Sequence, residues 1–286
     1  MSATVAVVGR GFGAAVHAPG WELAGAQVIG VAGRDDWHDL VARADVVSVA
    51  APPAAHRELV LAAVDAGARV LCEKPLATTI ADAELLEHAA RDVPNAVSFG
   101  YRALPAFARF RELLADAAEL DVRWTTGSRL RSAPHGWKDD PLQGGALSAY
   151  GVHTLDYARW LLGEAEVERA TVAPNEDAFT AELAHERGGR TRLTVSLVAE
   201  ERVHRLEAGD LVLENRHATD PVSTFTLTNA GRGLDVPGLD APAGADPRVP
   251  PFAKLALALL EDRERPTFTD GVQAQRLMDE VRRTAR

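Results

Sequence analysis

The sequence predicts an α/β protein with two domains: a doubly wound, parallel-sheet domain in residues 1–118 and an α+β domain with a largely antiparallel, open sheet in residues 119–286. Three observations predict this class. Short β-branched runs alternate with helical stretches over the first hundred residues, and closely spaced strand-like runs follow. In addition, 47% of the 286 residues are hydrophobic, which is enough to bury two cores.

The strand-like runs of the first domain lack the alternation of polar and apolar residues that half-exposed strands show. We therefore expect a parallel sheet that helices cover on both faces. The predicted strands are Thr4–Val8, Gln27–Ala32, Val46–Ala50, Arg69–Cys72 and Ala96–Phe99. The predicted helices are Ala54–Ala66, Ile80–Arg91 and Ala106–Ala117.

In the second domain, many short strand-like runs and the hairpin signal Gly188-Gly189 predict antiparallel pairing. Residues Asn229–Pro251 hold four glycines and five prolines, so we expect no regular element there, but an ordered excursion, a mobile flap or a surface loop. The predicted strands are Leu120–Thr126, Val167–Ala173, Phe179–Glu186, Thr191–Val198, His204–Glu207, Leu211–Glu214 and Ser223–Leu227, and the predicted helices are Ala146–Leu162, Pro251–Asp262 and Gly271–Arg283.

Composition excludes several classes of function. The 31 basic and 41 acidic residues give a net charge of −10, which disfavours a nucleic-acid or membrane partner. Cys72 is the single cysteine, so we expect neither a disulfide nor a cysteine-based metal site. No secretory leader is evident, and no apolar run approaches the ~18 residues of a membrane span. These features predict a cytoplasmic protein without a bound metal.

A glycine-rich turn directly follows the first predicted strand and opens a helix. It has the G-x-G-x-x-A spacing, in which the small residues permit a tight turn, a close backbone approach to a pyrophosphate and close helix–strand packing. The turn consists of Gly9, Arg10, Gly11, Phe12, Gly13 and Ala14. We expect a dinucleotide-binding turn of the Rossmann type; the alternative is a glycine-rich loop without a ligand.

The end of the second predicted strand indicates which dinucleotide binds. NAD-binding folds usually carry Asp or Glu there to accept from the ribose 2′-hydroxyl, but this chain has Gly33 and Arg34. A guanidinium pairs well with a 2′-phosphate, so the sequence favours NADP, with NADPH bound at least tenfold (about 1.4 kcal/mol) more tightly than NADH. In the alternative interpretation, Arg34 is a solvated cation beside Asp35 and Asp36.

Three further motifs carry a family resemblance. They are Ala51-Pro52-Pro53-Ala54-Ala55-His56, then Cys72-Glu73-Lys74-Pro75, and Gly144-Gly145-Ala146-Leu147 followed by Gly151-Val152-His153-Thr154-Leu155-Asp156. Over nearly its whole length the chain resembles the Gfo/Idh/MocA oxidoreductases, such as glucose–fructose oxidoreductase and inositol dehydrogenase. The resemblance implies a Rossmann domain, a C-terminal domain whose open sheet often makes subunit contacts, and hydride transfer between a nicotinamide and sugars, cyclitols or related carbonyl compounds.

The resemblance also implies roles for single residues. Lys74 corresponds to the family's active-site lysine and His153 to its active-site histidine, and both are expected to contact substrate. Tyr101 and Tyr150 are further substrate-binding candidates. Beyond the glycine-rich turn, the cofactor-binding candidates are Gly33, Arg34, Ala51, Pro52, His56, Glu73, Lys74 and Arg102.

Two features depart from the family pattern. Only thirteen residues lie between Ala32 and Val46, where members usually have another helix and strand, so the adenosine side of the Rossmann domain is predicted to be trimmed. Ala149 stands where members typically have an aspartate, one helical turn before the histidine, and it offers only a methyl group.

Hydride transfer to a carbonyl needs a proton or a cation near the oxygen, and Lys74 can supply both. It is one of three lysines beside 28 arginines and is predicted to follow a parallel strand at its carboxyl end, where such sheets bind ligands. Tyrosine hydroxyls at Tyr150 and Tyr157 could orient His153 in place of the aspartate. The alternatives are a surface Lys74 paired with Glu73 and a half-buried histidine of purely structural role; no partner is evident for the other histidines.

A basic segment with an aromatic residue precedes the helix that carries His153. If Arg131, Trp137 and Lys138 face the nicotinamide, they favour an anionic substrate; otherwise the segment is a solvated loop.

Together these patterns predict an NADP(H)-dependent oxidoreductase that reduces a carbonyl or imine of a small sugar-, cyclitol- or acid-like metabolite. Two alternatives stay open: a redox-neutral, nicotinamide-dependent elimination on a sugar, and a non-catalytic NADP-binding protein, which Ala149 would favour. We also expect a homo-oligomer, a dimer or tetramer, because an open antiparallel sheet with strands such as Thr191–Val198 is predicted to expose apolar side chains that a second copy would cover.

Overall fold

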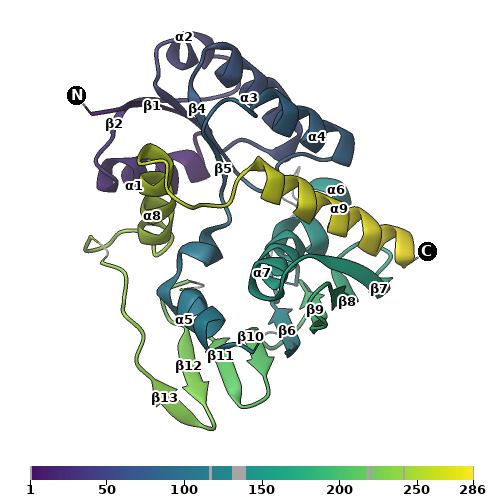
Figure 1. The fold of residues 1–286 in the computed structure, drawn as a ribbon. Coiled ribbons are helices and arrows are strands. Elements are labelled where there is room, and N and C mark those ends of the chain that lie inside the picture. Colours follow the sequence, from purple (N-terminus) through teal and green to yellow (C-terminus); the bar gives the residue numbers. More distant parts are fainter. Residues whose placement is uncertain are drawn as a thin grey trace. The chain divides into compact units, whose positions relative to one another are not determined.

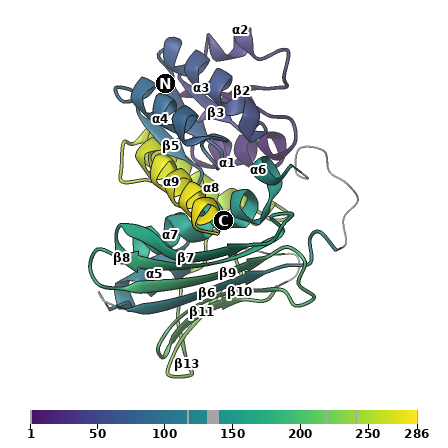
Figure 2. The same ribbon diagram turned by 90° about the vertical axis from the view of Figure 1, so that its right-hand side faces the viewer.

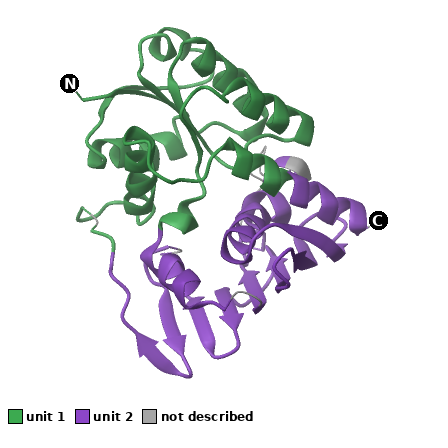
Figure 3. Ribbon diagram, viewed as in Figure 1, with its two compact units in different colours: residues 1–103, 239–275 green, residues 104–238, 276–286 purple. Residues whose placement is uncertain are grey.

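The protein is represented by a computed structural model that describes residues 2–115, 118–130, 140–217, 220, 222–240 and 242–285. The chain forms two compact units, one of residues 1–103 and 239–275 and the other of residues 104–238 and 276–286 (Figure 3). The sequence predicted a single boundary at residue 118. The units differ from that division because the predicted helix after Pro105 belongs to the second unit and residues 239–275 belong to the first.

The first unit contains a five-stranded parallel sheet in the order β2-β1-β3-β4-β5 (Figure 1). Its central strands are valine-rich and buried, as the absence of polar alternation predicted. The strands are β1 Thr4–Val8, β2 Gln27–Ala32, β3 Val46–Val49, β4 Arg69–Cys72 and β5 Asn95–Val97. This sheet confirms the predicted Rossmann-type class of the N-terminal domain.

Helices connect these strands. They are η1 Gly13–His17, α1 Ala18–Leu23, α2 His38–Val41, η2 Pro53–Ala55, α3 His56–Asp65, α4 Ile80–Ala89 and η3 Gly100–Ala103. The connection from β2 to β3 holds only the four-residue α2, in line with the predicted trimming. Thr79 caps α4, because its hydroxyl accepts from the backbone amide of Asp82 at 3.2 Å.

The helix α8, Val249–Leu260, returns from late in the sequence to the core of the first unit. Its Phe252, Leu255 and Leu259 belong to one buried cluster with Val5 and Val7 of β1. Most of its residues are buried, so the helix needs apolar surroundings on several sides, and the sequence pattern alone did not indicate which sheet provides them.

The second unit contains an eight-stranded sheet in the order β13-β12-β11-β10-β6-β9-β8-β7 (Figure 2). All neighbours pair antiparallel except β6 and β9, which are parallel. The strands are β6 Glu119–Thr125, β7 Ala165–Val172, β8 Ala178–His185, β9 Arg190–Ser196, β10 Val203–Ala208, β11 Leu211–Asn215, β12 Thr226–Asn229 and β13 Arg232–Leu234. The helices are α5 Pro105–Leu113, α6 Pro141–Gly144, η5 Leu147–Gly151 and α7 Val152–Leu162, and α9 Phe268–Thr284 belongs to both units.

The hairpin of β12 and β13 corrects one prediction. The sequence placed no regular element within Asn229–Pro251, yet Asn229 pairs with Arg232 across a two-residue turn. Ala230 and Gly231 both have positive φ, +48° and +74°, as the favoured two-residue hairpin turns require. The high glycine and proline content of the whole segment hid this short hairpin.

The open face of the sheet is polar, which corrects the expectation of an apolar one. In β6, the exposed Glu119, Asp121 and Arg123 alternate with buried apolar residues, and in β9 the exposed residues include Arg190 and Arg192. The described residues of this face therefore do not offer the apolar surface on which the predicted homo-oligomer rested.

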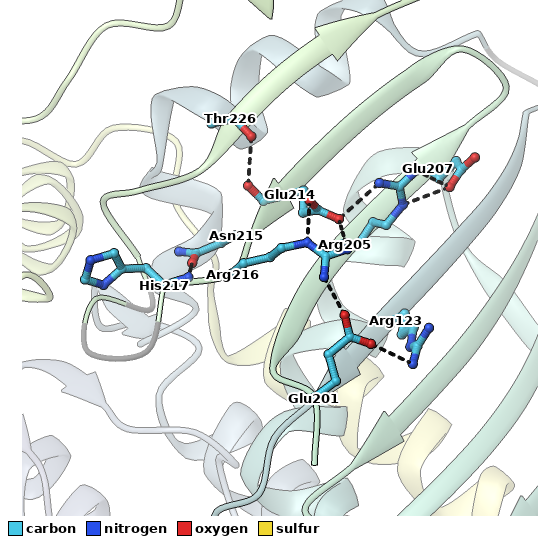
Figure 4. Close-up of polar contacts among 9 residues, drawn as sticks. All are labelled: Arg123, Glu201, Arg205, Glu207, Glu214, Asn215, Arg216, His217 and Thr226. Carbon is cyan, nitrogen blue, oxygen red and sulfur yellow. Dashed lines mark hydrogen bonds and ion pairs between the residues drawn. The ribbon is translucent and has the colours of Figure 1, made fainter. Parts of the chain in front are cut away.

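Ion pairs link neighbouring strands on this face. Arg192 lies 3.2 Å from Glu119 and 3.3 Å from Asp121. Nearer the sheet's edge, Arg205 contacts Glu207 and Glu214 (Figure 4). Arg216 contacts Glu214 and Glu201, and Glu201 also faces Arg123 (Figure 4). Opposite charges on adjacent strands support the register that the buried face sets.

In the part of the chain that the structure describes, no helix is long and apolar enough to cross a membrane. The same residues contain no cluster of three or more His, Cys, Asp or Glu side chains suited to a metal ion.

Candidate functional site

The glycine-rich turn lies between β1 and η1, and two of its glycines are required by packing. Gly9 has a φ of +134°, and a Cβ there would lie 2.3 Å from the carbonyl oxygen of Ala50. At Gly13 a Cβ would lie 2.9 Å from the side chain of Val7. A Cβ at Gly11 would meet no atom within 4 Å, so the backbone is open at this position.

The close packing of the first helical turn on β1 occurs at Gly13, and not at Ala14 as the G-x-G-x-x-A pattern predicted. Ala14 is exposed. The helix that follows the glycine-rich turn begins with the five π-helical residues Gly13–His17. The wider π-helical turn changes which residue faces β1. Phe12 is half-buried, with its ring 4.9 Å from the guanidinium carbon of Arg248.

A carboxylate that the sequence analysis did not assign lies at the end of β2. Asp36 accepts from the backbone amide of Gly33 at 2.6 Å, and its other oxygen pairs with the guanidinium of Arg10 from the glycine-rich turn. Arg34 is exposed, and its side chain has no partner among the described residues. An aspartate three residues after Gly33 is the signal that could have identified Asp36, because Asp side chains often bond nearby backbone amides.

His56 connects two loops at the carboxyl ends of the strands. The ring is fully buried; Nε2 lies 2.9 Å from the carbonyl oxygen of Ala51, and Nδ1 lies 3.0 Å from that of Pro75. Burial lowers the pKa of His56. The Ala51-Pro52 loop, predicted to bind cofactor, is thereby attached to the residue that follows Lys74.

Glu73 and Lys74 directly follow β4. The amide of Glu73 bonds the Val49 carbonyl oxygen at 2.9 Å, which extends the sheet pairing to this point. Its carboxylate lies 3.1 Å from Nε2 of the buried His17, and its other oxygen accepts from the amide of Lys74 at 3.3 Å. Burial raises the pKa of Glu73, but the hydrogen bonds from His17 and Ser98 and the charge of Lys74 oppose it, and the pKa is lowered overall.

Tyr101 and Arg102 lie on η3, after β5. Tyr101 is buried. Arg102 lies 3.0 Å from Asp270 at the start of α9, and both side chains are largely buried. Asp270 also accepts from the amide of Thr267 at 2.8 Å. The guanidinium of Arg102, which was predicted to bind cofactor, therefore holds the start of α9 in place through Asp270.

In the second unit, Tyr150 and His153 lie around Trp124 of β6. The ring centroids are 4.5 Å apart for Trp124 and Tyr150 and 6.1 Å apart for Trp124 and His153. Trp124 also stacks on His204 at 3.9 Å, and the hydroxyl of Tyr157 lies 3.0 Å from Nε2 of His204. Of the two phenols that could have oriented His153, that of Tyr157 therefore has another histidine as a partner.

His204 was not predicted to have a role. Burial, with a smaller effect of the Arg202 charge, lowers its pKa to about 3, so the imidazole is neutral at neutral pH. Ala149 lies within the π-helical segment η5, and its amide bonds the Gly145 carbonyl oxygen at 2.8 Å. The predicted substrate residues Arg131, Trp137 and Lys138 lie outside the described residues.

Comparison with known proteins assigns both parts of the chain to one family. Residues 4–101 match the family described as "Oxidoreductase family, NAD-binding Rossmann fold", of the Gfo/Idh/MocA group. Residues 107–208 match the "GFO/IDH/MocA C-terminal domain".

Curated relatives agree with this assignment. An uncharacterized oxidoreductase of Synechocystis is 29% identical, over 96% of this chain and 92% of the relative. Inositol 2-dehydrogenase 2 of Saccharopolyspora erythraea is 33% identical over 69% of this chain and 52% of its own length. Levoglucosan dehydrogenase of Pseudarthrobacter phenanthrenivorans is 31% identical over 48% of this chain and 38% of its own length.

Solved structures share the fold over the full chain. A levoglucosan dehydrogenase in complex with NADH and levoglucosan matches with a TM-score of 0.84 at 19% identity, and covers 100% of this chain and 97% of that one. An NAD-binding oxidoreductase from Klebsiella pneumoniae matches with a TM-score of 0.83 at 20% identity, with the same coverage.

Proposed function

The chain belongs to the Gfo/Idh/MocA family of NAD(P)-dependent oxidoreductases, and we propose that it uses NADPH to reduce a carbonyl or imine of a small, polyhydroxylated metabolite. The observation that carries the proposal is the arrangement of the first unit. The glycine-rich turn after β1 and Lys74 after β4 both lie at the carboxyl ends of strands in one parallel sheet, where such sheets bind ligands.

The residues of the glycine-rich turn fit a dinucleotide. Gly9 and Gly13 bring the backbone close to Ala50 and Val7, and Gly11 leaves the turn open to an approaching pyrophosphate. When bound, the nicotinamide supplies the hydride. Gly9, Gly11 and Gly13 would hold the pyrophosphate through the backbone, and Gly33 and Arg34 would face the adenosine ribose.

Preference for NADPH is supported by the partners of three side chains near β2. Both oxygens of Asp36 already accept, one from Arg10 and one from the Gly33 amide, so a ribose 2′-hydroxyl would have to share this carboxylate with them. The exposed guanidinium of Arg34 has no partner in the described part of the chain. A free cation next to an occupied carboxylate favours a 2′-phosphate.

Two side chains would act on the substrate. Lys74 would stabilise the developing negative charge on the substrate oxygen and transfer the proton that completes the alcohol, while the former carbonyl carbon receives the hydride. His153 would contact a substrate hydroxyl and set its orientation. Two of the relatives reported above are named for inositol and levoglucosan, which supports a polyhydroxylated substrate for this chain also.

One observation favours a second candidate function. Because residue 149 is alanine, no carboxylate stands one helical turn before His153, and a protein that binds NADPH without turnover would tolerate this change. The first experiment therefore separates binding from catalysis. Fluorescence titrations measure the affinities for NADPH and NADH, and NADPH oxidation is followed with a panel of cyclitol ketones, ketoses, anhydro-ketoses, sugar acids and imines.

We expect NADPH to bind at least about tenfold more tightly than NADH. We also expect at least one polyhydroxylated ketone to be reduced by the wild-type protein and not by Lys74→Met. Equal affinities would contradict the cofactor preference. Tight NADPH binding without turnover of any compound would instead support the non-catalytic alternative.

A further inference from the structure

A directional chain of hydrogen bonds runs through the core of the first unit toward Lys74. Trp21 of α1 donates from its indole nitrogen to the hydroxyl of Ser48 on β3 at 2.8 Å. The same hydroxyl lies 2.8 Å from Nδ1 of His17, and Nε2 of His17 lies 3.1 Å from the Glu73 carboxylate. Trp21, Ser48 and His17 are each 0% exposed, so no solvent can substitute for a missing partner.

The donors and acceptors determine which way the protons point. An indole nitrogen only donates, so the oxygen of Ser48 accepts from Trp21. The carboxylate of Glu73 only accepts, so Nε2 of His17 donates to it, and in the tautomer that carries only this proton Nδ1 accepts from the Ser48 hydroxyl. In this arrangement every donor in the chain has one acceptor, and Glu73 remains an anion.

Aromatic packing fixes the His17 ring. The ring lies 4.1 Å from Phe252 of α8, measured between centroids, and 5.3 Å from Phe12 of the glycine-rich turn, in an edge-to-face contact. Phe252 itself fills the space left by Gly20, where a Cβ would lie 2.4 Å from its ring. The imidazole therefore cannot turn away from Glu73 without displacing α8.

On the basis of this geometry and of the proposed function, we propose that His17 is a positioning residue for Lys74. His17 donates from Nε2 to one oxygen of Glu73, and the other oxygen accepts from the amide of Lys74, so the imidazole fixes the turn that carries the ammonium group. Glu73, which the sequence analysis assigned to the cofactor, acts in this interpretation as the link between His17 and Lys74.

The charges around Glu73 explain what His17 contributes. The groups that interact with this carboxylate include His17, Lys74, His56, Arg248 and the thiol of Cys72, together with the hydroxyl of Ser98. Burial favours the protonated, neutral form of Glu73, and the hydrogen bond from His17 opposes it. Without that donor, Glu73 should take up a proton more readily, and Lys74 should lose the nearby negative charge that favours its ammonium form.

The test measures the pKa of Lys74 directly, in the full-length protein without cofactor or substrate. The chain has only three lysines, Lys74, Lys138 and Lys254, so reductive methylation with ¹³C-formaldehyde gives few NMR signals besides that of the amino terminus. Lys138→Arg and Lys254→Arg assign the signals, and a pH titration then yields the pKa of Lys74.

Two isosteric variants separate the donor to Glu73 from the rest of the side chain. In His17→Gln the terminal amide nitrogen replaces Nε2 and still donates to Glu73, whereas in His17→Asn the shorter amide replaces Nδ1 and reaches only Ser48. We expect His17→Asn to lower the pKa of Lys74 by about 1 or more, since an opposite charge within a few ångströms has effects of this size. His17→Gln should leave that pKa near the wild-type value.

Glu73→Gln provides an independent route to the same result and should lower the pKa of Lys74 as His17→Asn does. Thermal unfolding of all variants shows whether they are folded at the temperature of the titration. A wild-type pKa of Lys74 in folded Glu73→Gln, or equal values in the two His17 variants, would overturn the proposal. Because no turnover is measured, a protein that proves unable to reduce any substrate would disprove the proposed function and leave this test intact.

Discussion

In the first unit Trp21, Ser48 and His17 are buried and each donor has one acceptor, whereas on the open sheet of the second unit the charged side chains are exposed or half-buried and share partners. His17 and Ser48 are fully buried, while Arg205 divides its guanidinium between Glu207 and Glu214 (Figure 4). Loss of a buried donor leaves its acceptor without a hydrogen bond, whereas after loss of an exposed charge water solvates the former partners. Burial, and not the number of ion pairs, should therefore determine which substitutions matter.

The largest expected effect is that of Lys74→Met, at the end of the buried chain. It should lower kcat roughly 10²–10⁴-fold with a reducible substrate, because general-acid catalysis and charge stabilisation are effects of that size, while NADPH still binds. The exposed Lys254 of α8 is the matched control, and Lys254→Met should have near wild-type kcat. His153→Ala should cost less than Lys74→Met; the opposite ranking would make histidine the proton donor.

A buried group of the second unit sharpens the comparison. The pKa of His204 is lowered to about 3 from 6.5, chiefly by burial. Between these values the unfolded chain binds a proton that the folded protein excludes, so the free energy of unfolding should fall as pH decreases from 6.5 toward 3. The contribution is on the order of a few kcal/mol.

Urea unfolding of wild type and His204→Phe over this pH range isolates the effect, because His56 and His185, whose pKa values are also lowered, are present in both proteins. The wild type should lose stability more steeply on acidification than His204→Phe. The exposed His88 is the control, and His88→Gln should follow the wild-type curve. Parallel curves for wild type and His204→Phe would show that the buried imidazole does not determine this acid sensitivity.

An exposed side chain of the first unit should change specificity and not stability. Arg34→Ala should weaken NADPH binding about tenfold (about 1.4 kcal/mol) and leave NADH binding nearly unchanged, because only NADPH has the 2′-phosphate. Paired titrations of both cofactors measure this. Arg91→Ala, which removes another exposed guanidinium of the same unit, should alter neither affinity. A proportional loss for both cofactors would place Arg34 at the pyrophosphate or in a structural role.

The smallest effect is expected on the charged face of the sheet. Arg192→Ala should change the free energy of unfolding by less than about 1 kcal/mol, because its pairs with Glu119 and Asp121 are exposed. Leu193→Ala, the next residue on β9, should cost about 2–5 kcal/mol because Leu193 is buried. Chemical denaturation compares the two; similar losses would contradict the ranking by burial.

The sequence predicted what depends on local pattern. Continuous apolar runs identified β1, β3 and β4, and the glycine-rich turn indicated where a dinucleotide binds. Contacts between distant segments could not be predicted in this way. His17 and Glu73 are 56 positions apart, and nothing near either residue shows that both face the same core. The placement of α8 depends likewise on which sheet accepts an apolar helix.

Local geometry that depends on a single side chain was also not predicted. Asp36 restores a carboxylate to the end of β2, because its side chain turns back to the amide of Gly33. The polar open face could be read from the alternation in β6 and β9, whereas strands such as Thr191–Val198 had been expected to expose apolar side chains. The anionic substrate stays a prediction, because it rests on Arg131, Trp137 and Lys138, which lie outside the described residues.

The central claim is that this chain transfers a hydride from NADPH to the carbonyl or imine carbon of a polyhydroxylated substrate with Lys74 as proton donor. The most direct measurement uses NADPH deuterated on either face of nicotinamide C4, the panel of candidate substrates, and mass spectrometry of the products. We predict one deuterium on the former carbonyl carbon, from one of the two labelled cofactors, in an amount equal to the NADP⁺ formed, and almost none with Lys74→Met. Deuterium that remains on the cofactor while the substrate is converted would contradict the claim and indicate the redox-neutral reaction.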